Sequence, residues 1–294
     1  MSSSRPTLWQ IDISHFSEKA RWALDYKGVD HVRRSPMPGV HMAIALWLSR
    51  GAKKTFPILQ LDGRTIADST AIVAALEERS PDRPLYPAEP EQRRRALELE
   101  DYFDEELGPH VRLLAWHDLI NEPQLLAEVA AQSAPGPLGK AKGLTGAYAR
   151  TFTSLRFGAN SDEAAETARA KIVTAMDRLE AELEANGGDF LVGDEFSVAD
   201  LTAASLFYPV VGPENGPMLA DQPTPAAFQA FRDGLCDHPG YIWVEENLPS
   251  PPQTGSAGGG ERKRLAKSYR EVAVCRQHIA SGRVGCQYAT DRMD

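Results

Sequence analysis

The chain has 294 residues, of which 42% are hydrophobic and 25% charged, and its formal net charge is −9. These values indicate a globular protein of two domains, and they argue against nucleic acid or a membrane as its main partner. Three scattered cysteines exclude a disulfide scaffold and a Cys-x-x-Cys metal site. Together with a polar N-terminus that has no apolar signal core, they favour a cytoplasmic location.

The first 80 residues alternate between strand and helix signals. Strands are predicted over residues 7–13 and 31–34, and helices over 18–28, which ends on a glycine, and 40–48. Two short apolar runs then flank Asp62-Gly63, which is a strong hairpin signal.

A helix over 69–79 completes this half, and four prolines between residues 80 and 90 indicate a linker. Strands that alternate with helices and close with a hairpin predict a mixed α/β sheet flanked by helices.

Beyond the linker only helical periods occur. Helices are predicted over 91–119, with a break near Gly108-Pro109, over 163–185, and over 198–208. The helix over 198–208 is apolar on nearly all of its faces, which indicates that it is buried. Residues 134–146 are rich in proline and glycine and are predicted to form a loop.

The last segment has a different character. Residues 249–260 have the composition of a flexible linker. Residues 250–294 hold eight Lys/Arg and four Asp/Glu, a local charge of +4, so the first 249 residues carry −13. A solvated extension and a partner-binding or dimer-contact segment are both compatible with this basic tail.

Four segments, in this order, resemble the glutathione transferase family. They are SHFSEKARWAL at 14–24, TFPIL at 55–59, ADSTAI at 67–72 and FLVGDEFSVADL at 190–201. The resemblance covers residues 7–248. It implies a homodimer that uses glutathione as co-substrate and needs no metal.

The resemblance also implies an order of domains. It gives a thioredoxin-like domain over 7–80, a linker over 81–90, an all-helical domain over 91–248, and an extension over 249–294 that the family pattern does not include. The Ser197–Asp200 box is expected to be structural, closing the start of a buried helix.

Glutathione requires an anion pocket, and the residues that open the helix over 69–79 suit one. The Ser69 hydroxyl and the unpaired N–H groups there would hold a carboxylate, helped by the helix dipole. Asp68 would bind the ammonium group of the ligand. Alternatively, either residue serves only as an N-cap.

A second part of the site is implied at Phe56-Pro57. In the resemblance this peptide bond is cis, which turns the Phe56 backbone outward so that it pairs with the tripeptide like an added strand. The alternative is a proline that merely starts a strand. Lys53 or Lys54 is positioned to reach the glycyl carboxylate.

The thiol-activating residue is Ser14 or Ser17. The alignment of 14–24 with the family favours Ser14, and Ser17 then caps the helix. His15 is expected to touch the ligand. The loop has no cysteine, which disfavours a thiol reductase that would form a mixed disulfide.

The electrophile is expected to contact the helix after the linker. A satisfied core residue is the commoner role for a histidine on such a helix. The candidates for the electrophile site are Phe16, Tyr102, His110, Leu113, Leu114, Trp116 and His117.

The leading hypothesis is an enzyme that stabilises the glutathione thiolate for attack on a small hydrophobic electrophile. The alternative is a binding or scaffold protein that kept the fold and lost the chemistry, and the basic tail favours it.

Overall fold

The structure is a computed structural model that describes residues 5–37, 40–132, 140–212 and 224–247. All of these residues belong to one compact unit, Met1–Pro252. The predicted linker and basic extension after residue 248 lie outside the described residues.

A four-stranded sheet forms the base of the N-terminal domain, in the order β2-β1-β3-β4. β1 runs parallel to β2, and the other neighbours are antiparallel, so the predicted mixed sheet is confirmed. The strands are β1 (Thr7–Trp9), β2 (Val32–Arg34), β3 (Ile58–Leu61) and β4 (Arg64–Ala67). β1 therefore ends four residues earlier than predicted.

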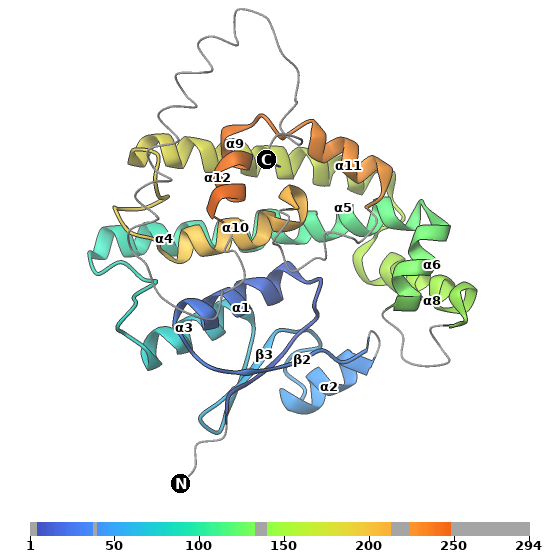
Figure 1. The fold of residues 1–294 in the computed structure, drawn as a ribbon, viewed down its shortest axis with the longest axis horizontal. Helices are drawn as coiled ribbons and strands as arrows, with labels where there is room; N and C mark the ends of the chain where they lie inside the picture. Colours follow the sequence, from blue (N-terminus) through green and yellow to red (C-terminus); the bar gives the residue numbers. More distant parts are fainter. Residues whose placement is uncertain (1–4, 38–39, 133–139, 213–223, 248–294) are drawn as a thin grey trace, which may run out of the picture. The chain divides into compact units, whose positions relative to one another are not determined.

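Three helices flank this sheet. They are α1 (His15–Tyr26), α2 (Val40–Leu48) and α3 (Ser69–Arg79). Figure 1 shows α1 and α3 between the strands and the helical domain, with α2 away from them. α2 packs on the sheet through Ala45 and Leu48, which form a core cluster with Phe56 and Ile58.

The start of α1 differs from the prediction. The helix begins at His15, three residues before the predicted start, because Ser14 is the N-cap and its side chain accepts a hydrogen bond from the Ser17 N–H. Ser17 therefore lies inside the first turn and is not the cap.

The C-terminal half is helical, as predicted. Its elements are α4 (Pro90–Tyr102), a π-helical turn η1 (Phe103–Leu107), α5 (Gly108–Ile120), α6 (Pro123–Gln132), α8 (Lys142–Phe157), α9 (Asp162–Asn186), α10 (Val198–Val211), α11 (Ala226–Asp233) and α12 (Pro239–Asn247). The predicted break near Gly108 is this π-helical turn, which joins α4 to α5. The loop predicted at 134–146 is wrong from Lys142 onward, where α8 begins.

α10 forms the centre of the helical domain, and every residue of it is buried. Its predicted capping box is present: Asp200 accepts hydrogen bonds from the N–H groups of Ser197 and Leu191, both at 2.8 Å. Burial raises the pKa of Asp200 to about 6. α1 packs directly against α10, so the two domains share a core.

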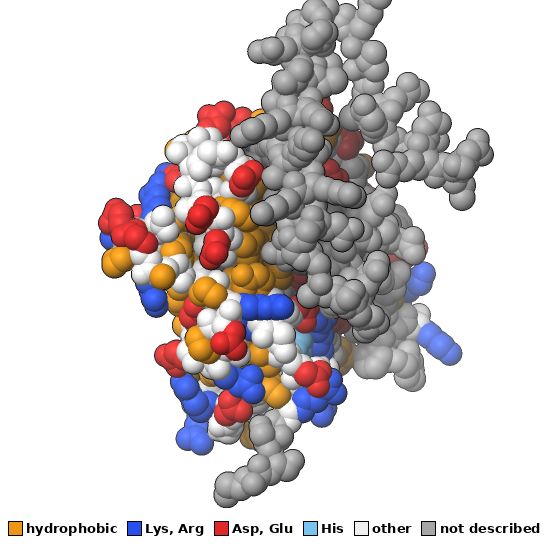
Figure 2. All heavy atoms as spheres, turned by 60° about the vertical axis from the view of Figure 1, so that its left-hand side comes forward, with side chains coloured by type: hydrophobic (Ala, Val, Ile, Leu, Met, Phe, Trp, Pro, Cys, Tyr) orange, Lys and Arg blue, Asp and Glu red, His pale blue; other side chains and the backbone are white. Residues whose placement is uncertain are grey.

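The surface carries charges of both signs. On the face in Figure 2, basic and acidic side chains alternate, with hydrophobic side chains between them. None of the helices in the described part of the chain is long and apolar enough to cross a membrane.

Candidate active site

Three segments that are far apart in the sequence meet at one edge of the sheet. In the strand register Trp9 lies opposite Ile58, and Ile58 lies opposite Ala67. The end of β1, the start of β3 and the end of β4 therefore lie side by side where the strands end, and together they form one edge of the sheet. α1 begins after β1, Phe56-Pro57 precedes β3, and Asp68-Ser69 follows β4, so the sheet brings these predicted residues together.

The two candidate serines differ in their surroundings. Ser14 is half-buried; its Oγ accepts a hydrogen bond from the Ser17 N–H at 3.3 Å, and its hydroxyl hydrogen has no acceptor among the described residues. Ser17 is fully buried, and its Oγ accepts a hydrogen bond from the Ile11 N–H at 3.2 Å. Ser14 therefore presents a free donor, whereas Ser17 holds the loop that leads into the helix.

A buried arginine supports the same loop. Arg21 donates to the Asp12 carbonyl at 3.1 Å and to the Gln10 side chain at 3.1 Å, and its Nε pairs with Glu18 at 2.6 Å. These contacts fix residues 10–12, which directly precede Ser14. No local sequence pattern indicates this support, because Gln10 and Asp12 lie outside the helix that carries Arg21.

The Phe56–Pro57 peptide bond is cis, as expected from the resemblance. The Phe56 ring is buried in the cluster with α2, and its centroid lies 6.5 Å from that of Trp9. The backbone N–H and C=O of Phe56 have no hydrogen-bond partner within the described part of the chain. Phe56 therefore presents one unpaired backbone donor and one unpaired backbone acceptor next to Ser69.

The start of α3 has the character of an anion site. Asp68 is the N-cap, with a positive φ of 103° that is unusual for a residue other than glycine. Its carboxylate accepts hydrogen bonds from the Thr70 N–H and from Lys53, both at 3.2 Å. Ser69 is 5% exposed, and neither its hydroxyl nor its N–H has a partner among the described residues. Lys54 is exposed.

A buried charge cluster lies beneath this helix start. Lys19 is completely buried, and its ammonium lies 2.9 Å from the Thr70 hydroxyl, 2.6 Å from Asp104 and 2.8 Å from Glu100. Thr70 also donates to Asp104 at 2.6 Å. Burial raises the pKa of Glu100, and the charge of Lys19 opposes this. Two carboxylates face one ammonium here, and Thr70 connects this cluster to the residue that follows Ser69.

Sequence reasoning missed this cluster. The available signal was that Lys19 falls on the apolar stripe of its helix, one turn before Ala23. Its partners come from the helical domain, and no local pattern connects them to α1.

His15 occupies a different place from the one expected. It is 4% exposed, and its Nε2 lies 2.9 Å from the Gly108 carbonyl, to which the neutral ring donates. Burial and the charge of Arg112 lower the pKa of His15 to about 3. Its ring joins α1 to the start of α5, so the expected ligand contact is replaced by a contact between the two domains.

Phe16 also packs on the start of α5. A Cβ placed on Gly108 would lie 2.5 Å from the Phe16 Cζ, so only glycine allows this close approach. Phe16 remains half-buried, and the guanidinium of Arg112 lies over its ring, 5.6 Å from the centroid. Arg112 was not among the predicted residues.

The other predicted electrophile contacts on α5 separate into two groups. His110 lies near the ion pair of Glu106 and Lys171, and burial lowers its pKa. It points away from Arg112, because residues two apart on a helix differ by about 200°. Half-buried Leu113 and Trp116 remain candidates, although Trp116 packs partly on the cluster of α5, α6 and α8.

His117 is a structural residue. It is buried, its Nδ1 lies 2.9 Å from the Ala159 carbonyl, and its Nε2 lies 3.2 Å from the Asn121 amide. Its Nδ1 donates to the Ala159 carbonyl, and the Asn121 amide lies at its Nε2. These contacts hold α5 against the turn between α8 and α9.

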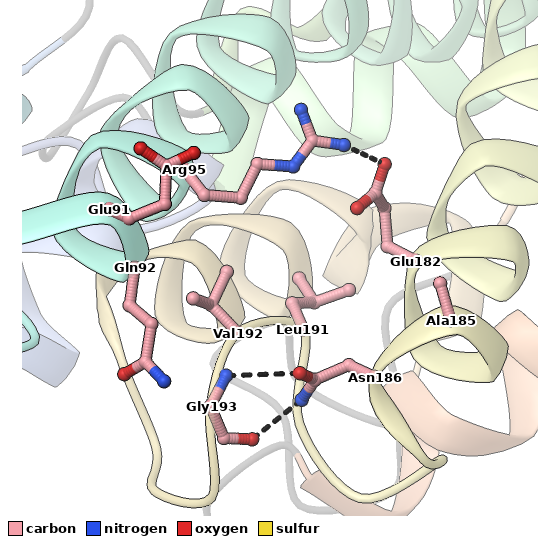
Figure 3. A pocket seen from close by; sticks show the side chains of 9 residues that line it. All are labelled: Glu91, Gln92, Arg95, Glu182, Ala185, Asn186, Leu191, Val192 and Gly193. Carbon is pink, nitrogen blue, oxygen red and sulfur yellow. Dashed lines mark hydrogen bonds and ion pairs between the residues drawn. The ribbon is translucent and has the colours of Figure 1, made fainter. Parts of the chain in front are cut away.

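One open groove lies elsewhere, between α4, α9 and the loop before α10 (Figure 3). An ion pair between Arg95 and Glu182 crosses its floor, and the Asn186 amide closes the loop through hydrogen bonds to Gly193. None of the predicted site residues lines this groove. No cluster of metal-ligating side chains occurs among the residues described.

The fold and the edge site define a thioredoxin-like domain joined to a helical domain. Residues 8–84 match the family description "Glutathione S-transferase, N-terminal domain", and residues 162–224 match "Glutathione S-transferase, C-terminal domain". The chain therefore carries domains that match the N- and C-terminal domains of glutathione S-transferases.

Two curated relatives are each 25% identical to this chain. One is named "Probable maleylacetoacetate isomerase" from Caenorhabditis elegans, matched over 87% of this chain and 99% of the relative. The other is "Maleylacetoacetate isomerase" from Dictyostelium discoideum, matched over 71% of this chain and 80% of the relative.

Solved structures show the same fold. The beta-etherase LigF from Sphingobium superposes with a TM-score of 0.54 at 20% identity, over 82% of this chain and 99% of that one. A theta class glutathione S-transferase from Xanthomonas axonopodis pv. citri was solved with glutathione bound. It superposes with a TM-score of 0.51 at 20% identity, over 81% of this chain and 95% of that one.

Proposed function

We propose that the protein binds glutathione along the shared edge of its sheet and stabilises the thiolate at Ser14 for attack on a small electrophile. The observation that supports this proposal most strongly is that three polar groups without a partner among the described residues lie along one edge. They are the Ser14 hydroxyl, the Phe56 backbone, and the hydroxyl and N–H of Ser69 at the start of α3. Their order matches the order of groups along the tripeptide.

The start of α3 is assigned to the γ-glutamyl end. The free hydroxyl and N–H of Ser69 would donate to the α-carboxylate, and the helix dipole adds to their effect. Asp68, with the buried carboxylates of Glu100 and Asp104 behind it, supplies the negative potential that the ammonium group needs. Lys53 or Lys54 is assigned to the glycyl carboxylate.

Ser14 is assigned to the sulfur. Its hydroxyl hydrogen has no other acceptor in the described chain, and it lies at the start of α1, where the helix dipole favours a negative charge. The thiol proton leaves to solvent when the thiolate forms. In a conjugation the sulfur then bonds to the electrophilic carbon, and the leaving group departs with the bonding electrons.

The same thiolate also serves an isomerisation, in which sulfur adds to an unsaturated carbon and is later expelled. The names of the two curated relatives support including this reaction class. We expect a cytoplasmic homodimer, on the strength of the family.

Retention on immobilised glutathione, followed by turnover of 1-chloro-2,4-dinitrobenzene with free glutathione, tests the proposal. We expect retention, elution by glutathione, and a rate that depends on protein concentration. Retention without turnover of this or an unsaturated electrophile would favour the scaffold function, and loss of both would refute glutathione as the ligand.

A further inference from the structure

Arg112 of α5 has no counter-ion among the described residues, although it is partly withdrawn from water. Its Nε is buried without a hydrogen-bond partner, and the guanidinium makes no ion pair with any described residue. Buried arginines are normally paired with carboxylates, so an unpaired one is costly in the free protein. The feature therefore needs an explanation beyond packing.

Aromatic rings hold this guanidinium in place. Its Cζ lies 5.6 Å from the centroid of Phe16 and 4.8 Å from that of Phe157. Both rings are half-buried, and cation–π attraction holds the guanidinium close to both of them. A charge held in position by rings, with its hydrogen-bond donors unused, is preorganised for an anion.

The surrounding charges are also positive. Exposed Arg156 of α8 lies near Arg112, and together with burial it lowers the pKa of Arg112 to about 10. His41 of α2 also experiences the charge of Arg156. Among the described residues, no carboxylate offsets the charge at Arg112. This local excess of positive charge stands in a chain whose net charge is −9.

The position relates this cation to the proposed thiolate site. Arg112 contacts Phe16 and acts electrostatically on His15, and these residues form the first turn of α1 directly after Ser14. We propose that the electrophile of this enzyme carries a carboxylate that binds Arg112, with its unsaturated or aromatic part against Phe16 and Phe157. This inference rests on the proposed function and specifies its substrate class.

The carboxylates of glutathione are the other possible source of the anion. They are assigned to the opposite side of Ser14, at Ser69 and at Lys53 or Lys54, so Arg112 is left for the second substrate. The two sources give different kinetics. If Arg112 binds the carboxylate of the electrophile, its substitution changes the preference between electrophiles while the KM for glutathione stays constant.

The test uses two electrophiles that differ in one group, 4-chloro-3-nitrobenzoate and 4-chloro-3-nitrobenzamide. In both, the thiolate sulfur replaces chloride, which leaves with the bonding electrons. Each kcat/KM is divided by the uncatalysed rate constant with glutathione, which removes the difference in intrinsic reactivity. We expect the wild-type protein to favour the benzoate, and Arg112→Gln to lower this preference about 10- to 100-fold.

Matched variants separate the charge from folding effects. Arg112→Lys should keep part of the preference, Arg156→Gln should lower it less than Arg112→Gln, and Arg94→Gln, an exposed arginine of α4, should leave it unchanged. An unchanged preference in Arg112→Gln overturns the proposal. So does an equal loss with both electrophiles through a higher KM for glutathione, which would assign the anion to glutathione itself.

Binding of the two glutathione conjugates, measured by titration calorimetry, does not depend on turnover. The carboxylated conjugate should bind the wild-type protein about tenfold more tightly than the amide, and Arg112→Gln should remove the difference. If the protein binds both conjugates equally, the carboxylate proposal fails even where glutathione binding holds. If it binds neither, the proposed function fails as well.

Discussion

Ser14 and Ser17 are joined by a hydrogen bond from the Ser17 N–H to the Ser14 Oγ, at 3.3 Å, yet their hydroxyls face different surroundings. Ser17 is fully buried and accepts from the Ile11 N–H, whereas Ser14 is half-buried and keeps its own hydrogen free. We therefore expect substitution of Ser14 to affect mainly activity and substitution of Ser17 to affect mainly stability.

Ser14→Ala should lower kcat/KM for glutathione conjugation about 10- to 100-fold, because a hydrogen bond to a charged sulfur is lost. Loss of the N-cap should also reduce the free energy of unfolding by about 1 kcal/mol. Steady-state kinetics with 1-chloro-2,4-dinitrobenzene measure the first effect. Ser14→Thr, which keeps a hydroxyl and a cap, should retain most of the activity; full activity in Ser14→Ala would exclude it as the activating residue.

Ser17→Ala should mainly reduce stability. The variant leaves the Ile11 N–H without its acceptor in a buried position, which costs about 1–3 kcal/mol. The shift of the urea unfolding midpoint measures this loss. At temperatures where the variant is folded, kcat/KM should stay within a few-fold of wild type, and a larger loss than that of Ser14→Ala would reverse the two assignments.

His15 should make the protein sensitive to acid. Its pKa is near its ordinary value of about 6.5 in the unfolded chain and about 3 in the folded protein. Between these values the unfolded chain binds more protons, so stability is fully present above pH 6.5 and falls by up to about 1.4 kcal/mol per pH unit below it.

His15→Gln provides the comparison, because an amide does not titrate in this range and retains a donor for the Gly108 carbonyl. Unfolding free energies of the two proteins, measured between pH 7 and pH 4, should diverge as the pH falls, with the wild type losing more. Parallel curves would show that His15 does not titrate differently in the two states.

Lys19 should contribute strongly to the stability of the fold. Lys19→Met leaves Glu100 and Asp104 buried without their cation and should cost about 3–5 kcal/mol. Because burial raises the pKa of Glu100, its charged form is disfavoured there, and Glu100→Gln should cost less than half as much. Urea denaturation measures both variants, and equal losses would contradict the account of the cluster.

Gly108 should be intolerant of a side chain. Gly108→Ala places a Cβ 2.5 Å from Phe16 Cζ and should destabilise the protein by about 1–3 kcal/mol. Gly143 is the matched control, since it lies in α8 with no atom within 4 Å of an added Cβ. Gly143→Ala should be neutral or stabilising by up to about 1 kcal/mol. Thermal unfolding compares the pair, and similar midpoints would contradict the close approach.

The elements with strong local signals were predicted closely, and weaker ones were missed. α2 and α3 match their predicted bounds, because apolar periodicity and the Asp68 cap mark them directly. The proline and glycine content of residues 134–146 predicts a loop, yet α8 begins at Lys142, and Gly146 within it packs closely on Ala127. α11 and α12 are short and lack a long apolar period.

The candidate site divides in the same way. Ser14, Phe56 and Ser69 could be proposed from the sequence because each belongs to a segment with a recognisable motif. Lys19 and Arg112 were not, because their environments exist only after α1 packs against the helical domain. The place of His15 beside Ser14 predicts a ligand contact, whereas its partner, the Gly108 carbonyl, comes from the helical domain and has no local sequence signal. For His117 the sequence leaves a core role and a substrate contact open, and its ring bonds to the Ala159 carbonyl.

The most direct test of the central claim is the apparent pKa of the glutathione thiol when it is bound, followed by the ultraviolet absorbance of the thiolate as the pH is varied. In the wild-type protein it should lie below the pKa of free glutathione, and Ser14→Ala should raise it by about 1–2 units while Ser17→Ala leaves it unchanged. The same bound pKa in wild type and Ser14→Ala would contradict the claim that Ser14 holds the thiolate.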